Sequence, residues 1–352
     1  MSLSRRSRTS SPLPAAFALL AVGLGVTAEV RALGDRGVAD TEQPVVEASP
    51  VPLDPAEASR KTVGKLRFLG GLWLRSQDPR FGGLSDLRLS ADGGTMWAIS
   101  DCGTGFMARL HYDLDGDLAS LSDARIVPLT DAAGQPLGHD DIDAESLMRV
   151  GADELDVGFE GHPCIRAYGP DFAGPSRMVG IPDGLDECGS NSGLELMADA
   201  GDGRRLLICE GRKNPSRTVP AWIGNGDSWQ TREYPLKFDG GWAGEPFRPT
   251  SAARLANGDM LLLERRFPPL AARVLHLSRE ALDGAGLIEA TELARFEAPL
   301  TLDNFEGIEA LRDARGRTLV YIVSDDNNCA KSPGARRVSP QRTLLLQFLL
   351  EE

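Results

Sequence analysis

Carboxylate side chains recur at the ends of hairpin-like apolar patterns in this chain of 352 residues. Each pattern has a short apolar run, a polar turn with Gly or Asp, and a second apolar run followed by Asp or Glu. In three patterns two acids are fifteen residues apart, as in Asp86/Asp101, Glu145/Glu160 and Glu195/Glu210. Two short strands joined by a turn bring such positions to the same end of a hairpin. The acids are therefore expected to gather. The five patterns cover residues 82–101, 143–160, 192–210, 250–264 and 304–325.

Gathered carboxylates are a candidate cation site. Ca²⁺ accepts six to eight oxygen ligands in flexible geometry, and without a cation such close like charges raise one another's pKa. Interleaved arginines are the alternative, because they would turn the same acids into a belt of salt bridges between repeats. The expected metal ligands are Asp101, Glu145, Glu160, Glu195, Glu210, Glu264, Glu309 and Asp326. The arginines available for a belt are Arg212, Arg265, Arg266 and Arg342.

The repeat predicts an all-β fold. A period of roughly fifty to sixty residues is typical of a β-propeller, and about four strands can be assigned to each unit. Five blades fit the pattern best, with six as the alternative. The last unit has only three obvious strands, and the apolar segment 64–74 is left over near the N-terminus. Pairing of that segment with the last blade would close the ring and remove exposed edges. The propeller is expected over residues 63–352.

The N-terminal part is expected to be a targeting segment. Three arginines precede an apolar run over residues 14–27, which is typical of a signal peptide over 1–28. The run is too short to span a bilayer comfortably. The pair Arg5-Arg6 leaves the twin-arginine route open beside the general secretory route. Residues 29–62 are rich in Pro, Glu and Ala and are expected to be a loosely ordered linker. The protein is therefore expected in the periplasm or outside the cell.

The charge balance restricts the partners. The formal net charge is −13, and removal of the signal peptide would make it more negative. Such a chain is a poor binder of nucleic acid and of anionic membranes. A monomer acting on a small molecule is expected.

Five cysteines are present in a chain that is expected to meet an oxidising compartment. A disulfide between Cys164 and Cys188 is predicted from their spacing. Cys102 and Cys329 follow strand-end acids in the first and last hairpins, which a closed ring makes neighbours, so they are a second candidate pair. Cys209 lies in an apolar run and is expected to be a free buried thiol.

Five further segments are distinctive: NSGLE (191–195), PTSAARLANGDMLLLERRF (249–267), DNFEGIE (303–309), SDDN (324–327) and QRTLLLQF (341–348). Together they resemble the phytase-like family of exported bacterial proteins. The resemblance covers roughly residues 65–350 and implies a β-propeller, export, esterase-like activity and possible calcium-dependent phosphoester hydrolysis. The implied site residues are Glu195, Glu264, Arg265, Arg266, Asp303, Asn304, Glu306, Asp325, Asp326 and Arg342. Two departures are an insertion over 328–340 and the lack of the Asp-Asp-Pro-Ala-Ile-Trp stretch of alkaline phytases.

The first hypothesis is therefore a phosphoester hydrolase with calcium in an acidic channel mouth. Glu306, Asp325, Arg265 and Arg266 are the expected catalytic residues, and Arg212, Arg342 and Asn304 are expected to bind substrate. Two alternatives stay open, namely a non-catalytic propeller that binds a ligand or protein, and a metal-dependent lactonase or carboxyl esterase.

Overall fold

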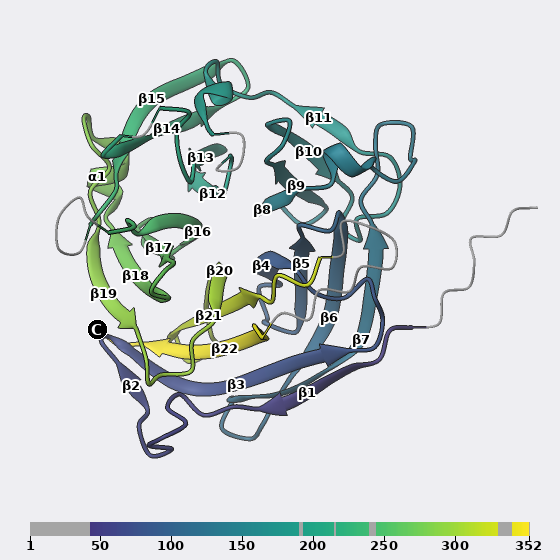
Figure 1. Cartoon of the computed structure of the whole chain (residues 1–352), viewed down its shortest axis with the longest axis vertical. Helices are drawn as coiled ribbons and strands as arrows, with labels where there is room; N and C mark the ends of the chain where they lie inside the picture. The colour runs from purple at the N-terminus through teal and green to yellow at the C-terminus, as the bar shows by residue number, and fades with distance from the viewer. Residues whose placement is uncertain (1–42, 190–192, 215, 239–243, 330–339, 352) are drawn as a thin grey trace, which may run out of the picture. The chain divides into compact units, whose positions relative to one another are not determined.

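The computed structural model describes residues 43–189, 193–214, 216–238, 244–329 and 340–351. The expected signal peptide and residues 29–42 of the expected linker lie outside this part of the chain. The described residues form five antiparallel sheets arranged in a ring, which is a five-bladed β-propeller (Figure 1). The sequence-based prediction of the fold and of the blade number is therefore confirmed.

Each blade has four antiparallel strands, and its first strand lies toward the middle of the ring (Figure 1). Blade I consists of β4 (Leu84–Leu89), β5 (Thr95–Ser100), β6 (Thr104–Tyr112) and β7 (Leu118–Pro128). Blade II consists of β8 (Ala144–Val150), β9 (Glu154–Phe159), β10 (Cys164–Tyr168) and β11 (Arg177–Val179). Blade III consists of β12 (Leu196–Gly201), β13 (Arg204–Ile208), β14 (Thr218–Asn225) and β15 (Ser228–Pro235). Blade IV consists of β16 (Arg248–Arg254), β17 (Met260–Arg266), β18 (Ala271–Leu277) and β19 (Thr291–Phe296).

Blade V closes the ring by combining the two ends of the described chain. Its strands are β20 (Asn304–Arg312), β21 (Thr318–Asp325), β22 (Thr343–Leu350) and β3 (Leu66–Ser76). The pairing of β22 with β3 confirms that the N-terminal segment supplies the missing strand. A short strand, β2 (Thr62–Val63), also pairs with β3.

The expectation of a loosely ordered linker is wrong for its C-terminal part. Strand β1 (Val46–Pro50) pairs antiparallel with β3 along the outer edge of blade V. Leu53 and Asp54 are buried, and Thr301 donates a backbone hydrogen bond to Leu53. An edge strand needs only one paired side, so a Pro-rich segment with few apolar residues can still occupy this position.

The apolar runs of the hairpins form the core between neighbouring blades. Strand β17 is representative, because its residues from Met260 to Glu264 are all buried. Blades IV and V meet through aromatic side chains, with Phe296 packed edge-to-face against Phe305 and Phe348. Such contacts add to the stabilisation from burial alone.

Helices are few in the described residues. Helix α1 (Arg279–Asp283) begins at Ser278, whose hydroxyl accepts a hydrogen bond from the Ala281 amide. The other two helical segments are single 3₁₀ turns, η1 (His139–Asp141) and η2 (Leu185–Glu187). None of these helices is long and apolar enough to cross a membrane.

The structure corrects one of the two predicted disulfides. Cys102 and Cys329 are bonded, as the closed ring predicts, with their Cα atoms 5.3 Å apart. Cys188 is bonded to Cys209 instead of Cys164, and Cys164 is a free, half-buried thiol. The reason is local: the turn η2 is tied to the loop after β13, where Lys213 donates a backbone hydrogen bond to Glu187. This contact places Cys188 beside the end of β13 in blade III, which Cys209 directly follows.

Candidate active site at an acidic channel mouth

A register shift near the start of the inner strand aims side chains toward the mouth of the channel. Strands β4, β8, β16 and β20 each shift their pairing by one residue there, at Ser85, Glu145, Thr250 and Glu306 respectively. Glu195, directly before β12, is the corresponding residue of blade III. β-Bulges of this kind often re-aim a side chain next to an active site. These five residues are called the inner positions below.

The second strand of each blade contributes one further residue to the same end. Aligning the blades by their strand pairing makes five residues equivalent, and they are called the end positions: Asp101, Glu160, Glu210, Arg265 and Asp325. Four of the five carry a carboxylate and blade IV alone carries a guanidinium. Blade IV also has an uncharged inner position, Thr250. The mouth is therefore anionic in four blades and cationic in one.

This alignment corrects the assignment of two acids. Glu264 was expected at the mouth, but it lies one residue before the end position. Its carboxylate accepts a hydrogen bond from Tyr234 at 2.5 Å and forms an ion pair with Arg273. Successive residues of a strand point to opposite faces, so Glu264 faces the contact between blades III and IV. Asp86 likewise lies one residue beyond the inner position Ser85.

Arg265 joins the carboxylates of two neighbouring blades. Its Nε lies 2.7 Å from Oε1 of Glu306, and its Nη2 lies 3.3 Å from Oε1 of Glu210. Asn304 donates a hydrogen bond of 2.7 Å to Oε1 of Glu306 and one of 3.3 Å to Asp325. The second oxygen of Glu306, Oε2, is buried without a hydrogen-bond partner among the described residues.

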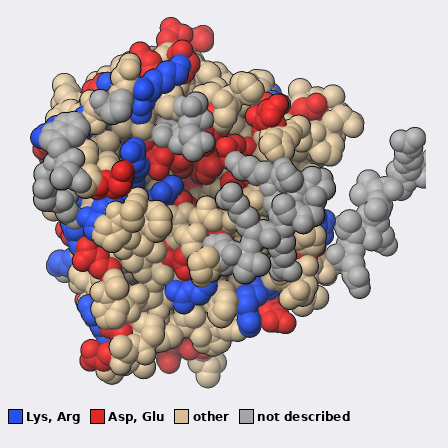
Figure 2. Space-filling model, viewed as in Figure 1, with Lys and Arg blue, Asp and Glu red and all other residues tan. Residues whose placement is uncertain are grey.

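On the side of blade II three acids lie close together. Carboxylate oxygens of Asp143, Glu145 and Glu160 all lie within 4.8 Å of one another. Glu160 accepts a hydrogen bond of 2.7 Å from the Gly193 amide. No lysine or arginine among the described residues forms an ion pair with Glu145. The acidic mouth is defined as Asp101, Asp143, Glu145, Glu160, Glu195, Glu210, Glu306 and Asp325, together with Arg265. Figure 2 shows acidic side chains gathered in a hollow toward the middle of this face of the ring.

The electrostatics of the mouth disfavour full ionisation. Burial, reinforced by the charges of Glu195, Asp101 and Glu160, raises the pKa of Glu145 well above its usual value. Burial also raises the pKa of Glu195 strongly, and the nearby Glu210 adds to the effect while Arg265 opposes it. Burial raises the pKa of Glu306 to about 8, against the opposing charge of Arg265, and raises that of Asp325 to about 7.

For Arg265, burial and the neighbouring carboxylates have opposite effects on the pKa, and the carboxylates have the larger effect. Burial would lower its pKa, but the charges of Glu306, Glu210 and Glu195 outweigh burial and raise the pKa further. The guanidinium is therefore a permanent cation of the mouth.

A buried ion pair closes the channel behind the mouth. Arg88 lies 3.0 Å from Asp86 and donates hydrogen bonds to the carbonyl oxygens of Ile308, Met197 and Ala252. Asp86 accepts hydrogen bonds from the Leu147 amide and the Ser251 hydroxyl. These partners belong to the inner strands of the other four blades. The pair, called the channel plug below, therefore connects all five blades at the axis.

The remaining expected site residues lie outside the central group. Arg266 stacks on Phe247 at 4.7 Å and lies 3.7 Å from Glu297. It therefore points away from the mouth, because successive side chains of β17 alternate between opposite faces up to the last residue of the strand. Arg212 pairs with Glu233 at 2.8 Å, and Arg342 pairs with Asp303 at 3.1 Å. Glu309 lies 3.9 Å from Arg88, at the channel plug. Asp326 accepts hydrogen bonds from the Gly83 and Asn328 amides, which ties blade V to blade I.

The sequence-based reasoning missed Asp143 and the channel plug. Asp143 precedes Glu145 by two residues, and this spacing of acids just before a strand could have indicated it. Arg88 stands inside the apolar run of β4, where a charged residue needs a buried partner.

Solved structures similar to this chain share little sequence with it. The WD40 repeats of RRP9 match over 86% of this chain and 100% of theirs, with 10% identity and a TM-score of 0.40. The PQQ-bound aldose sugar dehydrogenase of Streptomyces coelicolor matches over 87% of this chain and 99% of its own, with 11% identity and a TM-score of 0.40. The phage phi92 endosialidase matches over 87% of this chain and 58% of its own, with 10% identity and a TM-score of 0.39. No curated protein sequence matches the chain.

A family model described as phytase-like, with the esterase-like activity of phytase, matches residues 79–328. The match begins just before blade I, ends after β21 and includes every residue of the acidic mouth. The chain therefore belongs to the phytase-like family.

Proposed function

We propose that this protein is an exported hydrolase of phosphate esters and that its acidic mouth holds calcium. The observation that carries the proposal is the excess of carboxylates at the inner and end positions, most of them buried, with Arg265 as the one cation at these positions. Burying unpaired charge is costly, and a bound divalent cation is a direct way to offset that cost.

The donor set fits calcium. All candidate ligands are carboxylate oxygens, and hard oxygen donors are those that Ca²⁺ prefers. Asp143, Glu145 and Glu160 offer three oxygens within 4.8 Å of one another. A bound calcium ion would supply positive charge for phosphate oxygens and would lower the pKa of a nearby water molecule.

The side chains around Glu306 suit the handling of a proton. A pKa of about 8 for Glu306 and about 7 for Asp325 lies near neutral pH, which is favourable for a general acid or base. Arg265 and Asn304 both contact Oε1 of Glu306 and so orient its carboxylate. Glu306 is therefore assigned as the proton acceptor, with Arg265 and Asn304 as positioning residues. Arg266, Arg212 and Arg342 are already paired elsewhere and are assigned no role in the reaction.

Export is supported by the two disulfides, Cys102–Cys329 and Cys188–Cys209, because such bonds persist mainly in oxidising compartments. The signal peptide that the sequence predicts would provide the route.

The test combines a binding measurement with a substrate panel. Calcium should raise the melting temperature of chelator-treated protein, because a ligand that binds only the folded state stabilises it. p-Nitrophenyl phosphate should be hydrolysed in calcium, and Glu306→Gln should remove most turnover while the protein stays folded. Matched assays with p-nitrophenyl acetate and a simple lactone separate the carbon-ester alternative.

Three outcomes would contradict parts of the proposal. Melting that ignores calcium and chelator would exclude the cation and favour a belt of salt bridges. Hydrolysis of the acetate or lactone but not the phosphate would replace the substrate class. Calcium binding without turnover of any ester would favour a binding protein.

A further inference from the structure

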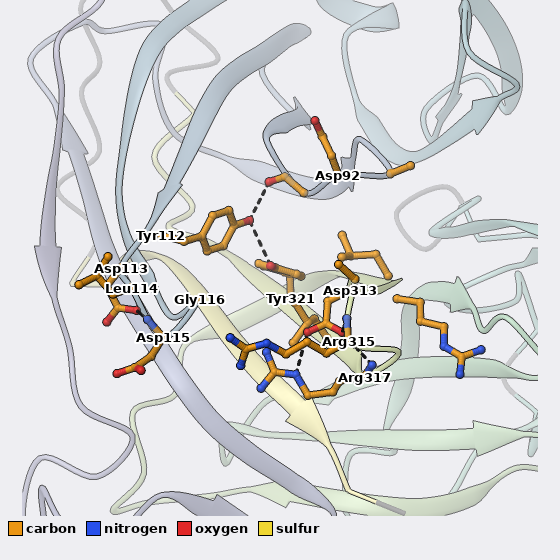
Figure 3. Close-up of a pocket in the computed structure, with 16 residues that line it drawn as sticks. Asp92, Tyr112, Asp113, Leu114, Asp115, Gly116, Asp313, Arg315, Arg317 and Tyr321 are labelled. Carbon is orange, nitrogen blue, oxygen red and sulfur yellow. Dashed lines mark hydrogen bonds and ion pairs between the residues drawn. The ribbon is translucent and has the colours of Figure 1, made fainter.

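Two cavities away from the acidic mouth differ in the charge of their walls. The larger, with a volume of about 610 Å³, lies between turns of blades I and V (Figure 3). Its lining contains four aspartates and three arginines, and walls of mixed charge select neither cations nor anions. The smaller, with a volume of about 380 Å³, lies beside β14 and β15 of blade III. It is called the tryptophan pocket below and is defined by Asp183, Trp222, Asp227, Trp229 and Thr231.

The pairing of β14 with β15 places the two tryptophans on one wall. Trp222 is paired with Thr231 in the register of these strands, and Trp229 lies two residues before Thr231. Side chains of paired residues, and of residues two apart on a strand, point to the same face of a sheet. Both indole rings therefore project from the same face of blade III. A hydrogen bond of 2.7 Å from the indole nitrogen of Trp229 to the carbonyl oxygen of Gly226 holds one of them in place.

The other wall is the segment that connects β11 of blade II to η2. A Cβ atom at Gly180 would lie 3.4 Å from the carbonyl oxygen of Gly226. A Cβ atom at Gly184 would lie 3.9 Å from Cζ2 of Trp222. The segment therefore follows the face of blade III that carries the tryptophans. Asp183 lies between these two glycines in the sequence and lines the pocket from this wall.

The charge of the lining is negative only. Asp183 comes from one wall and Asp227 from the turn between β14 and β15, and the lining contains no lysine, arginine or histidine. In the part of the chain that the structure describes, neither carboxylate has a hydrogen-bond or ion-pair partner. A cleft lined by one sign of charge attracts the opposite sign. The pocket is therefore suited to a cation.

The indole rings of this pocket are not covered by a cation of the protein itself. Two other tryptophans are covered in this way: the guanidinium of Arg75 lies 4.7 Å from the ring of Trp73, and that of Arg149 lies 4.7 Å from the ring of Trp97. No lysine or arginine among the described residues lies over either ring of the tryptophan pocket. Tryptophan attracts cations more strongly than the other aromatic side chains do, so this capacity is unused.

We propose that the tryptophan pocket binds a small organic cation such as an alkylated ammonium group. The cation would lie against the half-buried ring of Trp229, with the almost fully buried Trp222 at the bottom of the pocket. Asp183 and Asp227 would supply negative charge from the two walls. An ammonium group is a compact point charge, so its attraction to two carboxylates requires no fixed geometry between them. The inference does not depend on the proposed hydrolysis, because the pocket shares no residue with the acidic mouth.

The test compares a cation with its neutral isostere. Choline carries a trimethylammonium group, and 3,3-dimethylbutan-1-ol has a carbon atom in place of the nitrogen. Both are titrated against the full folded chain by ligand-observed NMR, with calcium present so that it competes with choline for the acidic mouth. Choline should bind saturably and with a Kd at least about fivefold lower than that of the alcohol.

Variants of the pocket separate the two contributions. Trp229→Leu keeps an apolar side chain but removes the indole ring, and it should raise the Kd of choline about fivefold or more. The double variant Asp183→Asn with Asp227→Asn should raise the Kd of choline by a similar factor and leave that of the alcohol nearly unchanged, because it removes charge but no apolar surface. Both aspartates are exposed, so the double variant should fold as the wild-type protein does.

Matched controls lie outside the pocket. Trp73→Leu removes a tryptophan that Arg75 already covers, and Asp115→Asn removes an exposed acid of blade I; both should bind choline with the wild-type Kd. Equal Kd values for choline and the alcohol, or an unchanged choline Kd in the double aspartate variant, would overturn the proposal. Weaker choline binding in Glu195→Gln, with the pocket variants unchanged, would overturn it by placing the cation at the acidic mouth.

Discussion

The channel plug and the acidic mouth both place charge on the inner strands of the propeller, yet their charges are satisfied very differently. Asp86 is completely buried but has Arg88, the Leu147 amide and the Ser251 hydroxyl as partners. Its pKa therefore rises only to about 6, because these partners oppose the effect of burial. Glu145 and Glu195 are surrounded mainly by other acids, and their pKa values rise well above the usual range.

This difference separates charge that is paired within the fold from charge that, in the proposed function, a bound cation would neutralise. A buried pair with complete hydrogen bonding costs little further energy and connects the strands around it. An ionised buried carboxylate without a nearby cation costs stability in the free protein, so the acids of the mouth need other groups to offset that cost. Arg265 provides this compensation next to Glu210 and Glu306, whereas among the described residues no lysine or arginine forms an ion pair with Glu145.

Breaking the channel plug should have the largest effect on stability. Asp86→Ala leaves the Arg88 guanidinium buried without its closest carboxylate, which costs about 3–5 kcal/mol. Urea unfolding should show this loss equally with calcium and with chelator, because the plug is no part of the proposed cation site. Asp115→Ala, at an exposed turn, is the control and should change stability by less than about 0.5 kcal/mol. A loss below about 1 kcal/mol for Asp86→Ala would mean that the plug is dispensable.

The pH dependence of the unfolding free energy should further distinguish the acidic mouth from the channel plug, and we expect it to be a smaller effect than the loss of the plug. A carboxyl group whose folded pKa is raised binds its proton more tightly in the folded state, so stability falls as pH rises between the unfolded and folded values. For Glu306 this window runs from 4.5 to about 8, and for Asp325 from 3.8 to about 7. Carboxylates with lowered pKa values, such as Asp283 and Asp313, change the stability only below about pH 4.

In chelator, the unfolding free energy should therefore decrease by at least about 1.4 kcal/mol between pH 5 and pH 8. Calcium should reduce this decrease, because the cation favours the ionised carboxylates. Thermal melts over this pH range, with and without calcium, provide the measurement. Stability that rises with pH in chelator would show that the mouth acids are already compensated by protein groups.

The fold could be read from the sequence because each blade repeats one hairpin with matching apolar runs. Even the closing strand was predictable, since segment 64–74 was left over where the last unit lacked a strand. Strand β1 was not, because an edge strand buries little and leaves almost no apolar pattern. Pairing of the cysteines also failed where it depended on the path of a loop, as for Cys188.

The site could be predicted only as a set of acids, because the lengths of the turns decide which residue of each strand reaches the mouth. Asp86 and Asp101 have the same spacing as Glu145 and Glu160, but the turn between β4 and β5 is longer than the turn between β8 and β9. The equivalent of Glu145 is consequently Ser85. In blade IV the acid Glu264 precedes the end position by one residue, and Arg265 occupies it. Spacing alone does not show where a strand pairing shifts.

We expect the smallest effect from Glu195→Gln, which is the most direct test of the charges in the acidic mouth. Removing one of several buried like charges should stabilise the chelator-treated protein by about 1 kcal/mol, the equivalent of somewhat less than one pKa unit. The same change should reduce the rise in melting temperature on adding calcium, because one oxygen charge of the cation site is lost. Glu264→Gln is the matched control: its carboxylate pairs with Arg273 and Tyr234, so the variant should lose stability in both conditions and keep the full calcium response. If Glu195→Gln destabilises the free protein as Glu264→Gln does, then Glu195 is a satisfied structural charge, and the distinction between plug and mouth does not extend to blade III.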